Sequence, residues 1–559
     1  MNQNMRPIEI TKNLLKEHGI RYVVVSPGGT NMALVHVLQD DPFFTLYSIV
    51  DERSAIYFAI GLYLQTGEII ATSCTSAQAT RNYIPGLTEA FYKRVPILAI
   101  TMEKHPTFIG QEYMQAPDQA SLPKDCVKKT FELPYIGTIQ DEYGCIRIVN
   151  EAICELTHDG YGPVQLCIPW IDFFIKETTP DIRSISRYTK YDSRFDLNGK
   201  QIMVVIGEHR PFTDSQIQAL EKFAESTDCV IYTNHLSNYK GKYSINANLE
   251  FTVTNISEFE KIYAPDLLIS IGGQTGDYPF YLLLSKPELS NTEHWRVAED
   301  GKFIDTYNKL TKVFDCSIES FFTDATEKTP IEHKYYQKFL ALCADTARDV
   351  DLPFSNAFTA QTLHDKLPKD SIVQFSILNS LRTWNLFDLD PSIECYSNVG
   401  AFGIDGGMST LIGQSVVTDK LCFMIIGDLA FYYDMNSLGI RHIKNNVRIL
   451  LINNNGGVEF KLNDGNHQKI DPFIAAAGHF KNAKGWAETC NFKYLSASNK
   501  EEFLKLYTDF IKTSEKPIIF ELFITDKNDY LGYQTLLDAN RNIDMKEKIK
   551  KGIKKFIGK

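Results

Sequence analysis

Short apolar runs alternate along the chain with longer segments that carry apolar residues at helical spacing. In the first third of the chain, the strings "YVVV" (22–25), "EIIATSCTS" (68–76) and "VPILAIT" (95–101) are short and rich in apolar residues. Runs this short and rich in β-branched residues predict buried strands. Segments 8–19 and 54–67 have the helical period and stop at a glycine, which is a common end of a helix. Strands and helices in alternation predict an α/β fold with a doubly wound parallel sheet.

The same alternation of strand and helix signals occurs three times. Polar stretches at about 176–200 and 324–355 separate the three α/β segments, and we predict them to be a linker and a polar helical connector. We therefore predict three doubly wound parallel-sheet domains, over residues 1–185, 198–325 and 355–535. Periodicity alone does not establish whether the first and third domains are copies of one fold.

The chain ends in a basic amphipathic segment, 540–559, which we predict to be a helix. Charged helical segments are most often solvated surface helices, and contact with a membrane or a protein partner is the alternative. The spacing of the lysines does not decide between the two.

The composition is that of an ordinary globular protein with an acidic balance. The 559 residues include 58 Lys and Arg against 69 Asp and Glu, a net charge of −11, which argues against a nucleic-acid partner because phosphate binding needs a basic face. The 11 cysteines form no C-x-x-C pair, so we expect reduced core cysteines. No apolar stretch approaches the roughly 18 residues of a membrane helix, and the N-terminus lacks the pattern of a signal peptide. We therefore expect a cytoplasmic enzyme without a membrane span.

Polar residues follow two apolar runs in the third segment. Gly427-Asp428 comes directly after the run 421–426, and Asn454 lies in an Asn-Asn-Asn-Gly-Gly string after the run 449–452. The interval between Asp428 and Asn454 matches one strand-helix-strand crossover, so both residues are expected at the carboxyl ends of neighbouring strands, where ligands bind. Their oxygens suit Mg²⁺ or Ca²⁺, with ligand phosphates completing the shell. The pair predicts a metal-diphosphate anchor, whereas each motif alone could be a helix cap or a turn.

The first segment offers a carboxylate at the start of a helix. Asp51 and Glu52 stand between a strand-like run, 46–50, and an apolar helical segment. A helix N-terminus favours a carboxylate, so one interpretation is that either residue simply caps the helix. The other interpretation is catalytic, because a glutamate in a dry site has a raised pKa and can exchange protons near neutral pH. Spacing alone does not decide between them.

Taken together, the motifs resemble those of thiamine-diphosphate-dependent enzymes. The strings "VVVSPGG", "DERSAIYFAIGL", "YSNVGAFGIDGGMST", "GDLAFYYDMNSL" and "INNNGGVEF" occur in the order found in the menaquinone-pathway synthase branch of that family, and the resemblance covers about residues 8–530. It implies three domains in the order pyrimidine, central and diphosphate. It also implies thiamine diphosphate and Mg²⁺ as cofactors, without FAD, and a homodimer or homotetramer whose active site lies between subunits.

The resemblance also assigns roles to individual residues. It implies that Glu52 is the catalytic carboxylate, hydrogen-bonded to the pyrimidine ring of the cofactor. It implies that Mg²⁺ is bound by the side chains of Asp428 and Asn454 and by the carbonyl of Gly456. The residues implied to contact the cofactor are Gln115, Ile404, Ser409, Gly427, Leu429, Asn454 and Gly456.

The activity that the resemblance implies is decarboxylation of a 2-oxoacid with transfer of the acyl anion equivalent to an acceptor. An enzyme with this activity is a carboligase, classed as a transferase or lyase. Acetolactate-type carboligation and simple 2-oxoacid decarboxylation are alternatives within the family. A non-catalytic scaffold that binds thiamine diphosphate is the alternative of a different class, and the presence of both Glu52 and the Asp428/Asn454 pair argues against it. A dinucleotide-binding oxidoreductase would need a glycine fingerprint that this chain lacks.

The substrate-binding positions depart from the synthase branch. Where that branch has arginines, which bind carboxylates through paired hydrogen bonds, this chain has Thr30 and Val399, among others. The loss of several cationic partners weakens the binding of a multiply anionic substrate, so we do not expect the menaquinone-pathway reaction itself. The residues that we expect near the substrate are Asn31, Lys104, His105, Asn379 and Arg382.

Overall fold

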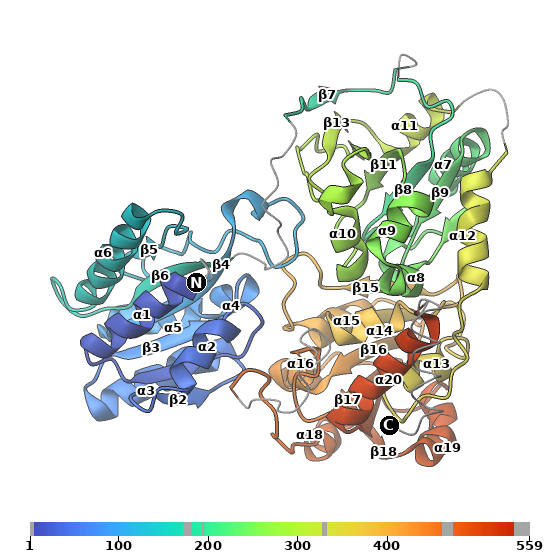
Figure 1. The fold of residues 1–559 in the computed structure, drawn as a ribbon. Coiled ribbons are helices and arrows are strands. Elements are labelled where there is room, and N and C mark those ends of the chain that lie inside the picture. The colour runs from blue at the N-terminus through green and yellow to red at the C-terminus, as the bar shows by residue number, and fades with distance from the viewer. Residues whose placement is uncertain (1–4, 171–181, 193–194, 327–331, 461–472, 542–559) are drawn as a thin grey trace, which may run out of the picture. The chain divides into compact units, whose positions relative to one another are not determined.

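Three sheets of parallel strands organise the chain (Figure 1). The computed structural model describes residues 5–170, 182–192, 195–326, 332–460 and 473–541. In the first sheet the strand order is β2-β1-β3-β4-β6-β5, and every pairing is parallel. Its strands are β1 (Tyr22–Val25), β2 (Thr45–Ser48), β3 (Ile70–Cys74), β4 (Ile97–Lys104), β5 (Thr130–Glu132) and β6 (Val164–Trp170).

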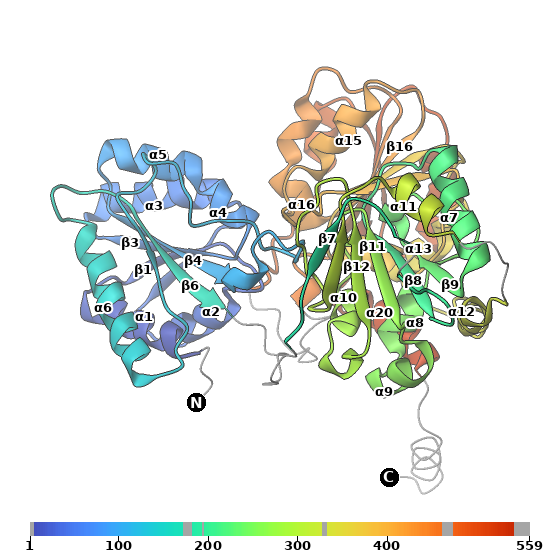
Figure 2. The same cartoon turned by 90° about the horizontal axis from the view of Figure 1, so that it is seen from above.

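Helices cover both faces of the first sheet, as Figure 2 shows. Val23 and Val25 point to one face, where they share a core with residues of α1, α2 and α6. Val24 points to the opposite face and packs with residues of α3, α4 and α5. Strands buried on both faces confirm the doubly wound α/β fold that the sequence predicts. The helices are α1 (Met5–Glu17), α2 (Met32–Gln39), α3 (Glu52–Thr66), α4 (Gln78–Asn82), α5 (Ile84–Lys93) and α6 (Ile139–Glu155).

The third sheet repeats the topology of the first. Its order, β15-β14-β16-β17-β19-β18, places the successive strands in the same positions as in the first sheet, so the two segments are copies of one arrangement. Its strands are β14 (Ile372–Phe375), β15 (Glu394–Ser397), β16 (Cys422–Gly427), β17 (Val447–Asn453), β18 (Lys493–Ala497) and β19 (Ile518–Phe523). Its helices are α13 (Asn356–Leu363), α14 (Asn379–Trp384), α15 (Gly407–Ser415), α16 (Asp428–Tyr433), α18 (Lys484–Thr489), α19 (Lys500–Phe510) and α20 (Asp526–Asn540).

The second sheet has the order β10-β9-β8-β11-β12-β13-β7 and is parallel throughout. Its strands are β7 (Ser186–Tyr188), β8 (Ile202–Ile206), β9 (Cys229–Tyr232), β10 (Ser244–Ile245), β11 (Leu267–Ile271), β12 (Glu293–Val297) and β13 (Leu310–Phe314). Its helices are α7 (Asp214–Ser226), α8 (Asn248–Val253), α9 (Ile256–Glu258), α10 (Tyr278–Leu284) and α11 (Ile318–Asp324). The connector predicted over 324–355 contains a helix, α12 (Lys334–Ala344), as predicted, but this helix is amphipathic rather than polar and buries Tyr335 and Phe339.

The prediction of a linker over 176–200 is wrong for three residues. Its residues Ser186–Tyr188 form β7, which pairs with β13 at the edge of the second sheet. An edge strand is bonded on one side only and needs no apolar run, so hydrophobic periodicity does not reveal it.

The chain divides into two compact units. The first comprises Met1–Thr179, Gln374–Asn379 and Ser397–Asp526, and the second comprises Pro180–Val373, Ser380–Tyr396 and Lys527–Lys559. The candidate residues Glu52, Asp428 and Asn454 therefore belong to the same unit.

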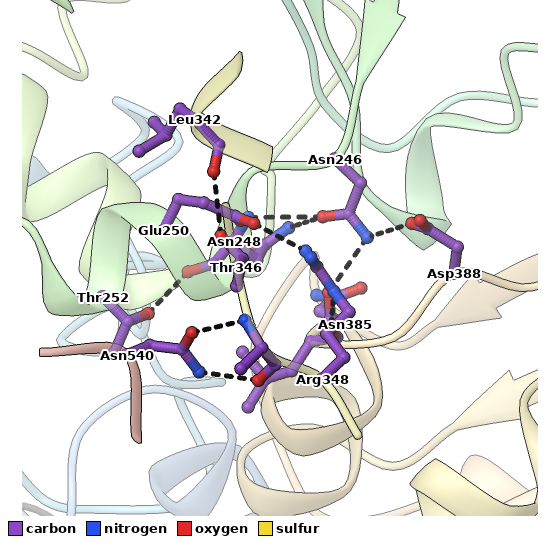
Figure 3. Close-up of polar contacts among 12 residues, drawn as sticks. Asn246, Asn248, Glu250, Thr252, Leu342, Thr346, Arg348, Asn385, Asp388 and Asn540 are labelled. Atoms are coloured by element: carbon purple, nitrogen blue, oxygen red, sulfur yellow. Dashed lines mark hydrogen bonds and ion pairs between the residues drawn. The ribbon is translucent and has the colours of Figure 1, made fainter. Parts of the chain in front are cut away.

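A polar cluster around the buried Glu250 joins separate segments of the second unit (Figure 3). Arg348 donates from Nη2 to Glu250 Oε1 at 2.8 Å and from Nε to the Leu386 carbonyl at 3.1 Å. Asn540, at the end of α20, donates to the Ala347 carbonyl at 2.8 Å and accepts from the Ala347 N–H at 2.7 Å. The cluster ties α8, the segment after α12 and α20 together.

The sequence also predicts the absence of a membrane span and the presence of a basic helix over residues 540–559. Within the described ranges, no helix has the length and apolar character needed to cross a bilayer. The basic helix predicted over 540–559 lies outside the described residues from 542 onward.

Candidate active site

The two strand ends that the sequence predicts to be neighbours meet at Asp428. This residue begins α16 directly after β16 and is 2% exposed. Its Oδ2 accepts hydrogen bonds from the backbone N–H groups of Asn454 and Gly456, both at 3.1 Å, and its Oδ1 accepts from the Leu429 N–H at 2.7 Å. Because β16 and β17 are parallel neighbours, their carboxyl ends lie at one edge of the sheet.

The loop after β17 requires a glycine at Gly456. Its φ is +151°, and a Cβ there would lie 2.9 Å from the Cα of Ala477 and 3.0 Å from the carbonyl oxygen of Ala475. Asn453 fixes the start of the loop by donating from Nδ2 to Glu521 Oε1 at 2.6 Å. A larger residue at position 456 would clash with the backbone of residues 475–477, so the glycine lets the loop pack against that segment.

The side chains at this edge of the sheet suit a hard divalent cation. Asp428 offers a carboxylate, Asn454 an amide and Gly456 a backbone carbonyl, and the first two residues are buried. Magnesium prefers oxygen ligands and completes an octahedral shell with water and phosphate oxygens. The residues present therefore fit Mg²⁺ bound together with a diphosphate.

The structure adds one residue that sequence reasoning missed. His479 Nε2 lies 3.1 Å from Asp428 Oδ2, and the His479 side chain is 9% exposed. The N–H of Lys481 donates to His479 Nδ1 at 3.0 Å, so the ring hydrogen is on Nε2 and is donated to Asp428. His479 stands in a stretch without apolar periodicity, and no motif marked it.

Glu52 is the first residue of α3 and is 7% exposed. The residue that caps the helix is Asp51, whose side chain accepts from the Ser54 N–H at 3.2 Å. The Glu52 carboxylate instead accepts a hydrogen bond at Oε2 from the hydroxyl of Tyr433, at 2.7 Å. The capping interpretation thus applies to Asp51, and Glu52 does not cap the helix. The catalytic interpretation of Glu52 stays open.

The surroundings of Glu52 favour its protonated form. Burial raises the pKa of the Glu52 carboxyl to about 7, and the like charges of Asp405 and Asp51 add to the rise. The hydrogen bond from Tyr433 acts in the opposite direction. A carboxyl that changes protonation near neutral pH is suited to general acid-base work.

The other residues expected around a cofactor lie in loops and helix starts of the same unit. Ser409, in the first turn of α15, donates both its N–H and its hydroxyl to Asp434, each at 2.8 Å. Ile404 is half-buried in the loop before α15, next to Asp405, whose Oδ2 accepts from Gln78 at 3.2 Å. The remaining positions are Gln115, in a loop with φ +58°, Gly427, at the end of β16, and Leu429, half-buried in the first turn of α16.

The loop after β1 is held by neutral side chains. The hydroxyls of Thr30 and Thr75 are 2.6 Å apart, and the Ser76 N–H donates to Thr30 Oγ1 at 3.0 Å. Asn31 is fully buried, and its Nδ2 donates to the Ser26 carbonyl at 3.0 Å and to Ser73 Oγ at 3.3 Å. The Asn31 amide therefore helps to build the loop that precedes α2.

The other candidate substrate residues are spread over both units. Lys104 Nζ lies 5.6 Å from the centre of the Tyr113 ring. His105 is followed by a short 3₁₀ turn, and burial lowers the pKa of its imidazole. Asn379 begins α14 and belongs to the first unit, whereas Arg382 belongs to the second unit. The Cζ atom of Arg382 lies 5.4 Å from the centre of the Tyr278 ring.

Comparison with known proteins identifies relatives along nearly the whole chain. The family description "Thiamine pyrophosphate enzyme, N-terminal TPP binding domain" matches residues 8–122. A protein of Phocaeicola vulgatus named 2-succinyl-5-enolpyruvyl-6-hydroxy-3-cyclohexene-1-carboxylate synthase is 35% identical over 532 residues, which cover 92% of this chain and 94% of the relative. A Bacteroides fragilis protein of the same name is 33% identical over 546 residues, covering 92% and 95%.

One solved structure extends the comparison. A thiamine-diphosphate-dependent 4-hydroxybenzoylformate decarboxylase of Rhodococcus jostii is 16% identical and aligns over 93% of this chain and 99% of its own, with a TM-score of 0.42.

Proposed function

Because the chain belongs to the thiamine pyrophosphate enzyme family, we propose that it is a thiamine-diphosphate- and Mg²⁺-dependent carboligase. It decarboxylates a 2-oxoacid and transfers the acyl unit to an acceptor. The observation that carries the proposal is the pair of sites in one unit, a buried Glu52 at the start of α3 and Asp428 joined to Asn454 and Gly456 at the strand ends.

Asp428, Asn454 and Gly456 hold the metal and through it the diphosphate. When bound, thiamine diphosphate supplies the nucleophilic carbon and the electron sink that decarboxylation of a 2-oxoacid needs. The half-buried Ile404 and Leu429 offer apolar surface to its rings. Gln115, Ser409 and Gly427 supply polar contacts, as the resemblance implies.

Glu52 holds and releases a proton at the pyrimidine ring. Its pKa, raised by burial to about 7, means that both protonation states are populated at neutral pH, which is the condition for efficient proton exchange. The Tyr433 hydroxyl donates to Oε2, and we propose that the ring contacts the other oxygen, Oε1.

The substrate differs from that of the synthase branch. Thr30 and Val399 stand where we identified arginines in that branch, Val399 is fully buried, and Thr30 bonds to neutral partners. Moving a carboxylate from water into a binding site costs free energy unless a cation or several hydrogen-bond donors contact it there. We therefore assign this chain a donor and an acceptor with fewer negative charges. The residues proposed to contact them remain Asn31, Lys104, His105, Asn379 and Arg382.

Glu52 and Tyr433 of α16 meet within one chain, and we propose that a second copy of the chain packs beside this site. The helix that begins at Glu52 carries an exposed apolar face, with Tyr57 at 47%, Phe58 at 39% and Leu64 at 64% exposure. Such a face on a helix that starts at a catalytic residue supports a subunit contact beside the site. We propose a homodimer as the smallest active form, in line with the family resemblance.

The test is carbon dioxide release from a panel of 2-oxoacids, with thiamine diphosphate and Mg²⁺ in excess and with and without added aldehyde or oxoacid acceptors. We expect release from one donor and a loss of about 10²- to 10⁴-fold in Glu52→Gln, the range of general acid-base catalysis. Glu68→Gln is the matched control, because Glu68 is an exposed residue of the same domain paired with Arg21.

The alternatives give different outcomes in the same assay. Release that needs no acceptor would identify a simple decarboxylase, and joining of two pyruvates would identify acetolactate-type chemistry. No release from any acid by a protein that binds the cofactor would favour the non-catalytic scaffold and contradict the proposal.

A further inference from the structure

The partner of Glu52 comes from a distant part of the chain. The Tyr433 hydroxyl donates to Glu52 Oε2 at 2.7 Å across 381 positions of sequence. Tyr433 is the last residue of α16, and Asp428 is the first. One short helix thus carries a candidate metal ligand at one end and the hydrogen-bond partner of the candidate catalytic carboxylate at the other.

The groups that face Glu52 set its proton affinity, and the charged ones are acidic. Asp51 lies on the same helix start and Asp405 in the loop before α15, and both act on Glu52 as like charges. Cys74 of β3 and Tyr83 at the start of α5 also face it. Burial raises the pKa of both groups far above neutral, so they stay uncharged.

Tyr433 remains a neutral donor at every working pH. Burial raises the pKa of its hydroxyl well above the ordinary value, and the neighbouring Glu52 raises it further. A hydroxyl that donates to a carboxylate stabilises the charged form more than the neutral form. Tyr433 is therefore the side chain that opposes burial and the two aspartates.

We propose that Tyr433 is a positioning residue for Glu52, which it holds by one carboxylate oxygen so that the other faces the reacting group. This inference rests on the proposed role of Glu52 as the catalytic carboxylate. The physical contact itself does not depend on turnover, so it can be tested apart from activity.

The first test is a titration of Glu52 in the cofactor-free protein by infrared difference spectroscopy, with Glu52→Gln used to identify the carboxyl band. In Tyr433→Phe we expect the titration midpoint to rise by about one pH unit, the size expected for one lost hydrogen bond to a charged group. Tyr92→Phe is the matched control, because the Tyr92 hydroxyl also donates to a carboxylate, Asp125, at 3.0 Å but on the surface of the same domain. The control should leave the midpoint unchanged.

A second variant should move the titration midpoint of Glu52 in the opposite direction. Tyr433→difluorotyrosine makes the phenol a stronger donor, which stabilises the charged carboxylate, and we expect the midpoint of Glu52 to fall. A midpoint that moves in neither variant overturns the proposal.

In the loaded enzyme, the acid limb of the pH profile of kcat/KM should move to higher pH in Tyr433→Phe by the same amount as the titration midpoint. A profile that keeps its shape while kcat falls would overturn the positioning role. If no 2-oxoacid is turned over by the unmodified protein but the infrared midpoint moves, the proposed function fails and the contact between Tyr433 and Glu52 stands.

Discussion

Two glutamates of this protein are almost equally buried and differ in what they face. Glu52 in the first unit is 7% exposed and Glu250 in the second unit is 1% exposed. Glu52 accepts from the neutral hydroxyl of Tyr433, whereas Glu250 accepts from the guanidinium of Arg348. Burial raises the pKa of both carboxyls, and at Glu250 the charge of Arg348 opposes the rise.

The difference separates a reactive group from a structural one. At a buried carboxylate beside a cation, the charge of the cation opposes the rise in pKa and the ion pair ties segments together, as at Glu250 in the cluster of Figure 3. A buried carboxylate beside a neutral donor and like charges changes protonation near neutral pH, as catalysis requires. The charge of the partner, rather than the depth of burial, distinguishes the two roles.

The largest expected change is in the free energy of unfolding, when the Arg348–Glu250 ion pair is broken. Arg348→Met leaves the Glu250 carboxylate buried without its cation, and we expect the free energy of unfolding to fall by about 3 kcal/mol. Urea unfolding followed by circular dichroism measures it. Arg147→Met is the control, because Arg147 and Glu151 are 64% and 46% exposed and such surface pairs contribute less than about 1 kcal/mol.

A double variant sharpens the result. Glu250→Gln in the Arg348→Met background removes the stranded charge, so part of the lost stability should return. Equal destabilisation in the single and double variants would mean that Glu250 does not carry a charge in the folded protein, and the contrast with Glu52 would disappear.

The second effect is a pH dependence of stability at Glu52. The folded protein holds this proton up to a pKa of about 7 against an ordinary value of 4.5, so the folded state loses stability as pH rises through that window. Glu52→Gln does not titrate, and we expect it to gain up to about 3 kcal/mol over the unmodified protein between pH 4.5 and 8, at about 1.4 kcal/mol per pKa unit.

Unfolding of both proteins in urea at the two pH values measures this effect. Glu68→Gln, at an exposed position, should show no such change. A difference between Glu52→Gln and the unmodified protein that is the same at both pH values would contradict the raised pKa of Glu52.

The smallest effect concerns the like charge beside Glu52. Asp51→Asn keeps a good helix cap but removes the charge that raises the pKa of Glu52. We expect the infrared titration midpoint of Glu52 to fall, by less than the change in Tyr433→Phe. Arg53→Met is the control, since Arg53 pairs with Asp51 at 3.3 Å and is 53% exposed; a midpoint that moves in both variants alike would assign the effect to that pair.

The sequence predicted the parts of the site that depend on local pattern. The runs 421–426 and 449–452 were apolar, short and followed by polar residues, and they form β16 and β17 with Asp428 and Asn454 at their ends. Parallel neighbours bring such ends together by geometry alone, so strand prediction was sufficient to place this pair. The three-residue strand β7 had no such pattern and was missed.

The contacts between segments that are distant in the chain could not be predicted from local sequence patterns. The hydrogen bonds of Asn31 to Ser26 and Ser73 could not be predicted from the residue types of the loop, and its expected contact with the substrate stays a prediction. His479 reaches Asp428 from a stretch without periodicity. Both depend on where loops fold back, and loop conformation is set by tertiary packing rather than by local spacing.

By itself, the sequence determined the doubly wound sheets, the strand ends that carry Asp428 and Asn454, and the helix start that carries Glu52, because periods of two and 3.6 residues and turn chemistry act over short distances. Only the tertiary structure decided that Asp51 takes the cap, that Tyr433 holds Glu52 and that Arg348 holds Glu250. The partners of Glu52 and Glu250 lie far apart in the chain, and burial, which gives these two contacts their electrostatic effect, exists only after the segments have packed.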